Sequence, residues 1–313
     1  MRTGIGTGEA SARVGSPPQA EAEERVSKRR LVPVLLGGVA AMSSASILIR
    51  LCGAPVLSIA AYRLALASLA FMIGAGFERR EREPFLVPNR WTVASGLFLA
   101  VHFAAWIQSL RLTSVASSVL LVQMAPIFVA IASALWLSEK PSGLQGMGIL
   151  LATIGTLATA GLDFAAGTKP LLGDALALVG ALGAAGYWIF GRIARRQLST
   201  AAYVRTVYAI SAVVLGAVAV AAGAPLAGFS RRDMLLLLLI ALVPQCIGHT
   251  TFNWALRHLS ATAVSVFALG EPVGAAVLAF FILHERPPAP NLVGALAVLA
   301  GIYLALRGEP KRR

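Results

Sequence analysis

The chain carries little charge, few cysteines and no catalytic signature. Charged residues make up 13% of the 313 residues, and only 14 are acidic. Cys52 and Cys246 lie far apart in the sequence, which excludes a disulfide framework and a cysteine metal site. The sequence also lacks a Walker loop, a Gly-x-Ser-x-Gly elbow, a His-Glu-x-x-His zinc motif and a dinucleotide fingerprint. We therefore expect no enzyme, no cofactor and no metal.

Apolar residues are abundant instead. They make up 57% of the chain, and the mean hydropathy is +0.76. A soluble domain cannot bury that much apolar surface, so the composition indicates an integral membrane protein. Apolar runs near twenty residues long recur, and each can cross ~30 Å of hydrocarbon as a helix. We predict an all-α membrane protein with ten transmembrane helices, at 31–51, 55–76, 91–110, 114–137, 143–161, 171–191, 201–223, 234–256, 261–283 and 289–307.

The net charge of +13 does not indicate a nucleic-acid partner, because the basic residues follow the pattern of membrane topology. Most Lys and Arg fall on one set of alternate loops and flanks, which by the positive-inside rule places both termini in the cytoplasm. We expect a multi-pass protein of the inner (plasma) membrane. Residues 1–30 are polar without an apolar signal core, so they are predicted to be a disordered cytoplasmic tail. Residues 308–313 form a basic cytoplasmic C-terminus.

The sequence contains an internal repeat. Residues 106–159 align without a gap on residues 252–305. The matched positions are Trp106 with Phe252, Pro126 with Pro272, Glu139-Lys-Pro with Glu285-Arg-Pro, Gly148 with Gly294 and Gly155 with Gly301. The predicted halves are 31–161 and 171–307, each with five helices. Because five is an odd number, the second half must enter the membrane from the side opposite to the first. We therefore predict inverted-topology repeats with a substrate site where the two halves meet.

Several short segments resemble one known family. They are Tyr62-Arg63, Leu-Ser-Glu139-Lys-Pro, Leu-Gly-Asp174, Asn253-Trp-Ala-Leu-Arg257 and Gly-Glu271-Pro272. Together with the ten-helix pattern, they resemble the EamA-type members of the drug/metabolite transporter (DMT) superfamily, over residues 31–307.

The resemblance implies a secondary active transporter that moves small metabolites, such as amino acids or nucleosides, by alternating access. Without an ATP site, the energy must come from a gradient, and family analogy favours export. The implied partners are a small-molecule solute and membrane lipids, with protons and a homodimer left open, and no nucleic acid. Two alternatives stay open: a lipid or polyisoprenoid flippase, and a non-transporting membrane subunit.

Glu271 is the acidic residue nearest the middle of any predicted helix. A charge at membrane depth costs ~2.5–3.5 kcal/mol or more, so such residues are functional candidates. Its repeat partner is Ala125, so the repeat does not explain it. Pro272 frees a backbone carbonyl and lets the helix bend beside the charge. We predict proton coupling or binding of a substrate ammonium at Glu271; a structural, hydrogen-bonded carboxyl stays the alternative.

Other polar and aromatic residues fall inside the predicted spans. Arg63 could bind a substrate carboxylate or phosphate through two parallel hydrogen bonds, or it could form an ion pair with Glu271. Gln245, His249 and Asn253 are spaced four residues apart in the predicted span 234–256, so they form a polar stripe on one helix face. The stripe either lines a watery path or forms hydrogen bonds to other helices. The predicted substrate and proton pathway consists of Glu271, Arg63, His249, Asn253, Gln245, His102, Trp106, Gln123 and Tyr187. The predicted structural gate or hinge residues are Pro126, Pro272, Glu139 and Glu285.

Overall fold

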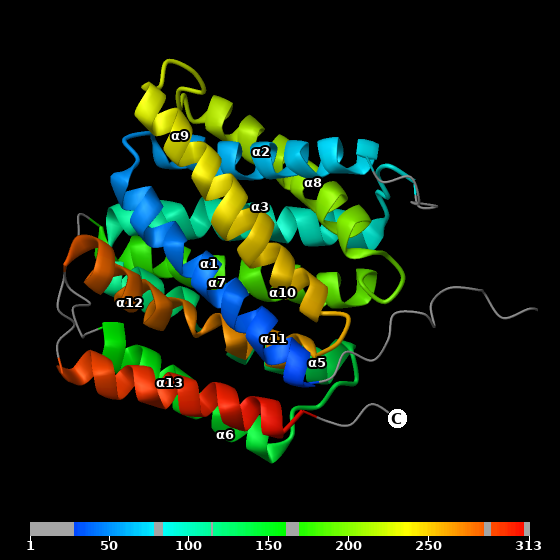
Figure 1. The fold of residues 1–313 in the computed structure, drawn as a ribbon, viewed down its shortest axis with the longest axis vertical. Coiled ribbons are helices and arrows are strands. Elements are labelled where there is room, and N and C mark those ends of the chain that lie inside the picture. The colour runs from blue at the N-terminus through cyan, green and yellow to red at the C-terminus, as the bar shows by residue number, and fades with distance from the viewer. Residues whose placement is uncertain (1–27, 78–83, 114, 161–168, 285–288, 310–313) are drawn as a thin grey trace, which may run out of the picture.

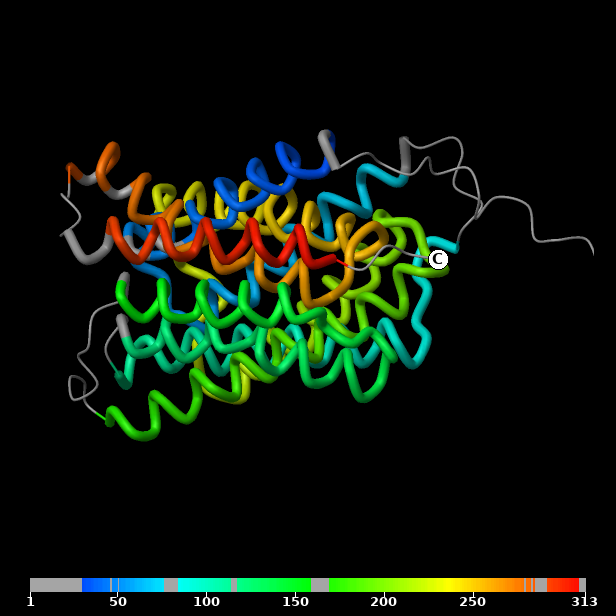
Figure 2. The backbone as a smooth tube through the Cα atoms, turned by 90° about the horizontal axis from the view of Figure 1, so that it is seen from below, coloured from blue at the N-terminus to red at the C-terminus, as the bar shows by residue number. Residues whose placement is uncertain are grey.

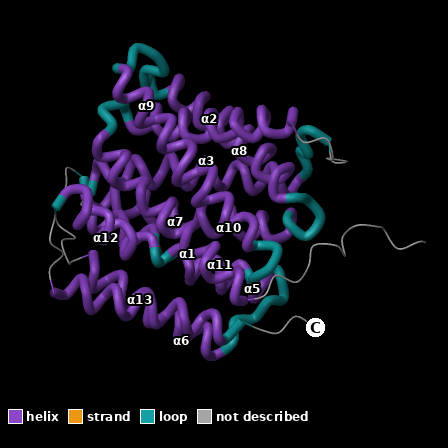
Figure 3. Tube along the Cα trace, in the orientation of Figure 1, coloured by secondary structure: helices purple, strands orange, loops and turns teal. Residues whose placement is uncertain are grey.

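The structure is a computed structural model that describes residues 28–77, 84–113, 115–160, 169–284 and 289–309. Over these ranges every regular element is a helix (Figure 3). Eight helical stretches are long and apolar enough to cross a membrane, and shorter apolar helices cover 143–158 and 292–307. The predicted all-α membrane class is therefore confirmed for the described chain. Glu285 lies outside the described residues.

The first half of the chain begins with a helix that starts earlier than expected, at Lys28, inside the segment predicted to be a disordered tail. Asn89 caps the third helix, since its side chain accepts hydrogen bonds from the backbone N–H groups of Trp91 and Thr92. The helices are α1 (Lys28–Leu51), α2 (Val56–Phe77), α3 (Arg90–Leu112), α4 (Val115–Val122), α5 (Ala125–Trp136) and α6 (Gly143–Ala160).

The second half uses serine caps repeatedly. Ser199, Ser230 and Ser260 each accept a hydrogen bond from a backbone N–H of the helix that follows. The helices are α7 (Pro170–Ala194), α8 (Thr200–Ala221), α9 (Arg231–Ile240), the π-helix η1 (Ala241–His249), α10 (Thr250–Ala255), α11 (Ala261–Ala268), α12 (Glu271–Leu283) and α13 (Ala289–Arg307).

Two predicted spans are broken in the middle. The span 114–137 is divided between α4 and α5 by a turn at Gln123–Met124, and 261–283 is divided between α11 and α12 by a turn at Leu269–Gly270. A proline follows each break. Because proline has no N–H to donate to the preceding turn, it cannot continue the hydrogen bonds of one unbroken helix. The two turns occupy equivalent positions of the sequence repeat. The span 234–256 also departs from a plain α-helix, since η1 contains Pro244 and makes wider turns.

The helices pack in pairs. α3 lies along α7, α2 lies along α8, and α1 crosses the molecule beside α9, η1 and α10 (Figure 1). α6 and α13 lie together on one edge of the molecule, as the view turned by 90° also shows (Figure 2).

Glycines set how closely α6 and α13 approach. A Cβ atom on Gly148 would lie 2.6 Å from the carbonyl oxygen of Gly301, and one on Gly155 would lie 2.5 Å from that of Gly294. Such positions allow backbones to meet where lipid provides no hydrophobic drive. The two pairs run in opposite sequence directions, so the helices pack antiparallel.

Candidate functional site

A cavity of about 100 Å³ lies at the meeting point of the broken helices. Val122, Gln123 and Ala125 line it from the first break, and Glu271 and Pro272 line it from the second. Further wall residues come from α1, α2, α3, α7 and η1. A cavity of this size, lined mostly by apolar surface with a few polar groups, has room for several waters or a small solute. Discontinuous helices at a shared cavity are a recurrent design of membrane solute sites.

Arg63 projects from α2 into the wall of this cavity and is 1% exposed. Its Nε donates a hydrogen bond to Oε1 of Gln245 at 2.6 Å, and the guanidinium carbon lies 4.5 Å from the centre of the Phe103 ring. Within the described chain no carboxylate oxygen lies within 4.0 Å of the guanidinium. A buried charge without a counter-ion in direct contact is costly. The Arg63–Glu271 ion pair that the sequence left open is therefore not formed.

Glu271 is the first residue of α12, where the helix dipole favours a negative charge. Its side chain is half-buried and lines the cavity. Its backbone carbonyl accepts a hydrogen bond of 2.9 Å from Oγ of Ser43 on α1. Its carboxylate has no hydrogen-bond partner among the residues that the structure describes. The equivalent position at the other break is Ala125, so the pair of breaks contributes one carboxylate to the cavity.

Aromatic rings form much of the remaining wall. The rings of His102 and Trp106 stack at 5.8 Å between centroids with an interplanar angle of 12°. Nδ1 of His102 lies 2.9 Å from the carbonyl oxygen of Gly180, so this nitrogen carries the proton, and Nε2 is left as an acceptor in the neutral ring. The rings of His249 and Phe103 meet edge to face at 5.6 Å.

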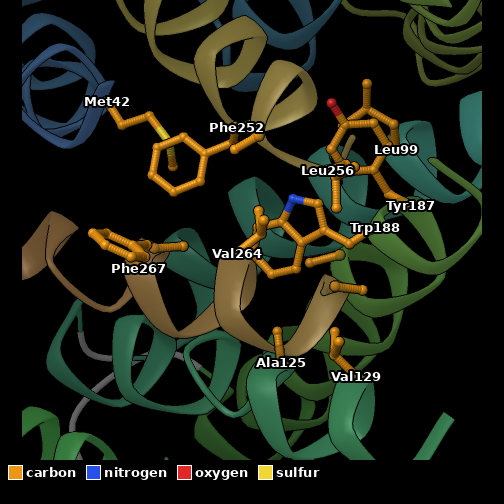
Figure 4. Close-up of a cluster of buried hydrophobic side chains, with 14 of the residues drawn as sticks. Met42, Leu99, Ala125, Val129, Tyr187, Trp188, Phe252, Leu256, Val264 and Phe267 are labelled. Atoms are coloured by element: carbon orange, nitrogen blue, oxygen red, sulfur yellow. The ribbon is translucent and has the colours of Figure 1, made fainter. Parts of the chain in front are cut away.

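A buried apolar cluster supports this wall (Figure 4). Met42, Tyr187 and Trp188 line the cavity and belong to the same cluster as Phe252 and Phe267. The cavity therefore has close-packed surroundings on the side of α10 and α11, which restricts where a solute can lie.

The polar stripe of the eighth predicted span divides into three roles. His249 lines the cavity, whereas Gln245 and Asn253 are fully buried outside its lining. Gln245 holds Arg63. Asn253 accepts a hydrogen bond of 2.6 Å from the Tyr187 hydroxyl and donates one of 3.2 Å to the Tyr208 hydroxyl, linking α7 and α8. Bonding to other helices thus occurs along the stripe, and a watery path along it stays a prediction.

Glu139 lies away from the cavity, just after α5. It accepts hydrogen bonds from Nε and Nη2 of Arg192, at 3.1 and 2.9 Å, and from Arg196 at 3.1 Å. Arg192 also donates to the carbonyl oxygen of Leu256 at 2.5 Å. One carboxylate therefore joins the end of α5 to α7 and, through Arg192, to the end of α10. Its role as a gate residue stays a prediction, as do the roles of Pro126 and Pro272.

Sequence reasoning missed Phe103 and Arg192. Phe103 carries the face on which the Arg63 guanidinium rests, but an apolar ring in an apolar helix gives no signal of its own. Arg192 has the appearance of a topology-setting basic residue at a helix end, and only the tertiary structure reveals its pairing with Glu139. The described residues contain no cluster of three His, Cys, Asp or Glu that could hold a metal ion.

These features define a class: a multi-pass α-helical membrane protein whose broken helices meet at a cavity that contains charged side chains. The EamA-like transporter family model matches residues 31–161 and 171–307, and the chain belongs to that family. It is a membrane transporter, and the predicted resemblance to EamA-type members of the DMT superfamily is confirmed.

Several proteins with similar sequences are named as transporters. An uncharacterized transporter of Archaeoglobus fulgidus is 24% identical over 252 residues, covering 79% of this chain and 86% of the relative. The uncharacterized transporter YxxF of Bacillus subtilis is 22% identical over 216 residues, 69% of each chain. The uncharacterized inner membrane transporter YhbE of Escherichia coli is 35% identical over 80 residues, 26% of this chain and 25% of the relative. A crystal structure of a protein 18% identical in sequence superposes with a TM-score of 0.76, covering 90% of this chain and 98% of that chain, which supports the fold.

Proposed function

We propose that the chain has ten membrane-spanning segments arranged as two inverted repeats. Four features support this arrangement. Each helix break has a counterpart at the equivalent repeat position, and so do the two described non-glycine residues with positive φ, Ser138 at 54° and His284 at 56°. The packing of α3 on α7 is matched by that of η1 and α10 on α1. The glycines of α6 and α13 meet antiparallel, as helices related by a two-fold axis in the membrane plane would.

The protein is proposed to be a secondary active transporter of a small solute, coupled to protons through Glu271. One observation carries this proposal: Arg63 and Glu271 face the same cavity without pairing with each other. An unpaired cation and an unpaired carboxylate inside a membrane are costly unless a solute or a proton compensates them. Binding at the meeting point of two half-structures then allows alternating access.

The Glu139–Arg192 pair is proposed to stabilise one state of the transport cycle. It ties the first half to the second at one end of α7. The Arg192 side chain is 6% exposed and that of Glu139 is 21% exposed, so water screens this pair less than a surface pair. Opening the protein at this end would have to separate the two groups. Placement of this end in the cytoplasm, residence in the inner membrane and transport in the direction of export belong to the same proposal.

The test is solute-driven proton flux in proteoliposomes that contain the purified protein and an internal pH dye. Pools of amino acids, nucleosides and organic acids are added in turn. We expect one pool to change the internal pH, and Glu271→Gln to abolish that change while labelled solute still exchanges. Asp233→Asn is the matched control, because Asp233 is a carboxylate at the exposed start of α9, away from the cavity.

Two outcomes would contradict the proposal. Proton flux unaltered by Glu271→Gln would remove the coupling role of Glu271. Failure of every water-soluble pool to exchange, together with movement of labelled lipid between leaflets, would replace the solute transporter with a flippase.

A further inference from the structure

We propose that the solute is a small organic monoanion with a planar apolar group, that its carboxylate binds Arg63, and that a proton on Glu271 accompanies it. This proposal rests on the proposed transport function and specifies the substrate class of the same cavity. It follows from the charge balance of the cavity, from the hydrogen-bonding groups in its wall and from the shape of its aromatic surface.

The first observation is the orientation of Arg63. Gln245 holds Nε, and the Phe103 ring lies against the guanidinium face, so the side chain has a fixed direction. The two terminal nitrogens have no acceptor in the described part of the chain. A guanidinium with these nitrogens available binds a carboxylate in a two-point fork. The cavity thus offers a built anion receptor rather than a mobile surface arginine.

The second observation is a set of buried donors around the cavity that have no acceptor. Nε1 of Trp106, Nε1 of Trp188 and Nε2 of Gln245 are buried and have no acceptor among the described residues. These N–H groups come from α3, α7 and η1, and both tryptophans line the cavity. Buried donors without acceptors are rare in native proteins and call for water or a ligand. A ligand rich in acceptor oxygen satisfies them, whereas an ammonium would add further donors.

The third observation is the charge that an anion would meet. Glu271 is the acidic residue in the cavity lining, and the other titratable or charged groups there are Arg63, His102, His249 and Tyr187. An anion beside an ionised Glu271 would be repelled, whereas a protonated Glu271 removes that repulsion and can donate a hydrogen bond. One anion and one proton entering together leave the net charge of the cavity unchanged. Binding of the anion is therefore expected to weaken as pH rises.

The fourth observation concerns the rest of the ligand. The nearly parallel rings of His102 and Trp106 belong to the cavity lining, and Phe103 and Trp188 add further aromatic area to it. Flat aromatic walls favour planar groups through offset stacking and edge contacts. The cavity of about 100 Å³ limits that group to a small one.

Four matched probes test the sign of the ligand's charge on the unmodified protein in lipid nanodiscs: benzoate, benzamide, benzylamine and phenylglycine. They share one ring and differ in being anionic, neutral, cationic and zwitterionic. We expect benzoate to bind at least about tenfold more tightly than the other three, and its binding to weaken as pH rises. Equilibrium dialysis with labelled probes measures this without requiring transport or a variant.

Two isosteric variants then change one charge each. Gln245→Glu places a carboxylate next to Nε of Arg63, at the site of the 2.6 Å hydrogen bond, and should weaken benzoate binding about tenfold or more by competing for the guanidinium. Glu271→Gln imitates the protonated acid and should keep benzoate binding while removing its pH dependence. Arg90→Gln is the control. The guanidinium carbon of Arg90 also lies over an aromatic ring, 4.3 Å from the centre of Trp91, but Arg90 is exposed.

Tight binding of benzylamine or phenylglycine that Glu271→Gln abolishes would overturn the proposal, because it would assign an ammonium to Glu271. Binding of benzoate no tighter than that of benzamide, or absence of binding by every probe, would also overturn it. None of these results would affect the proposal of solute transport itself, which stands or falls on exchange of the solute pools in proteoliposomes.

Discussion

Replacing Gly148 with alanine should destabilise the protein, although alanine is the better helix former. An added Cβ at Gly148 would lie 2.6 Å from the carbonyl oxygen of Gly301 and 2.8 Å from the backbone nitrogen of Ala305. Both are backbone atoms of α13, which cannot rotate away as a side chain can. The two helices must therefore separate along their shared edge.

Gly146 provides the reference, because it lies on the same helix and a Cβ there would meet nothing within 4 Å. Both substitutions gain about 1 kcal/mol of helix propensity. Gly148→Ala alone carries the overpacking cost of about 1–3 kcal/mol. The difference in the free energy of unfolding between Gly146→Ala and Gly148→Ala isolates that cost, and contact with backbone places it toward the upper end.

Equilibrium unfolding by SDS in mixed micelles, followed by tryptophan fluorescence, measures the difference. A double variant with Gly301→Ala should lose less than the sum of the single losses, because the helices separate only once. Equal stability of Gly148→Ala and Gly146→Ala would refute the close approach of α6 and α13. Strict additivity would show that the two glycines do not share one contact.

Three further changes should alter stability in the same assay. Ser138→Gly should stabilise the protein by about 0.5–1 kcal/mol, because the residue has a φ of 54°, and an unchanged unfolding midpoint would argue against that conformation. Glu309→Gln should lower the stability of the protein by about 1–2 kcal/mol, because the carboxylate accepts hydrogen bonds of 2.7 Å from both the backbone N–H and the hydroxyl of Ser260. An unchanged free energy of unfolding would show that this contact does not hold the end of α13. Asn253→Leu should cost about 2–3 kcal/mol by leaving the buried Tyr187 hydroxyl without its acceptor, whereas a gain in stability would mean that the hydroxyl finds another.

The sequence predicted the all-α membrane class because hydropathy is a property of composition over windows of about twenty residues, and tertiary contacts hardly change it. It did not predict where helices break. Pro126 and Pro272 indicated bending, but the turns at Gln123–Met124 and Leu269–Gly270 depend on which backbone groups find other partners. The π-helix η1, which packs against α1 and α2, was not predicted either.

The candidate site, like the fold, was predicted from the sequence only in part. Glu271 and Arg63 stand out in sequence because a charge inside an apolar run is rare, and both line the cavity. The absence of an ion pair between them could not be foreseen, since it depends on a few ångströms of side-chain placement. Gln245 lay in the predicted stripe, but its role in holding Arg63 becomes visible only when α2 and η1 are side by side.

The placement of Glu271 opposite Ala125 has a consequence for ancestry. Two identical half-size proteins assembled head to tail would place the same residue at both helix breaks, giving the cavity either two carboxylates or none. Two carboxylates in one cavity would disfavour each other's ionisation, and with none there would be no acid at the breaks to exchange a proton. A cavity with a single acid at its breaks therefore requires two halves that differ in sequence, which one chain provides because its two halves can mutate separately.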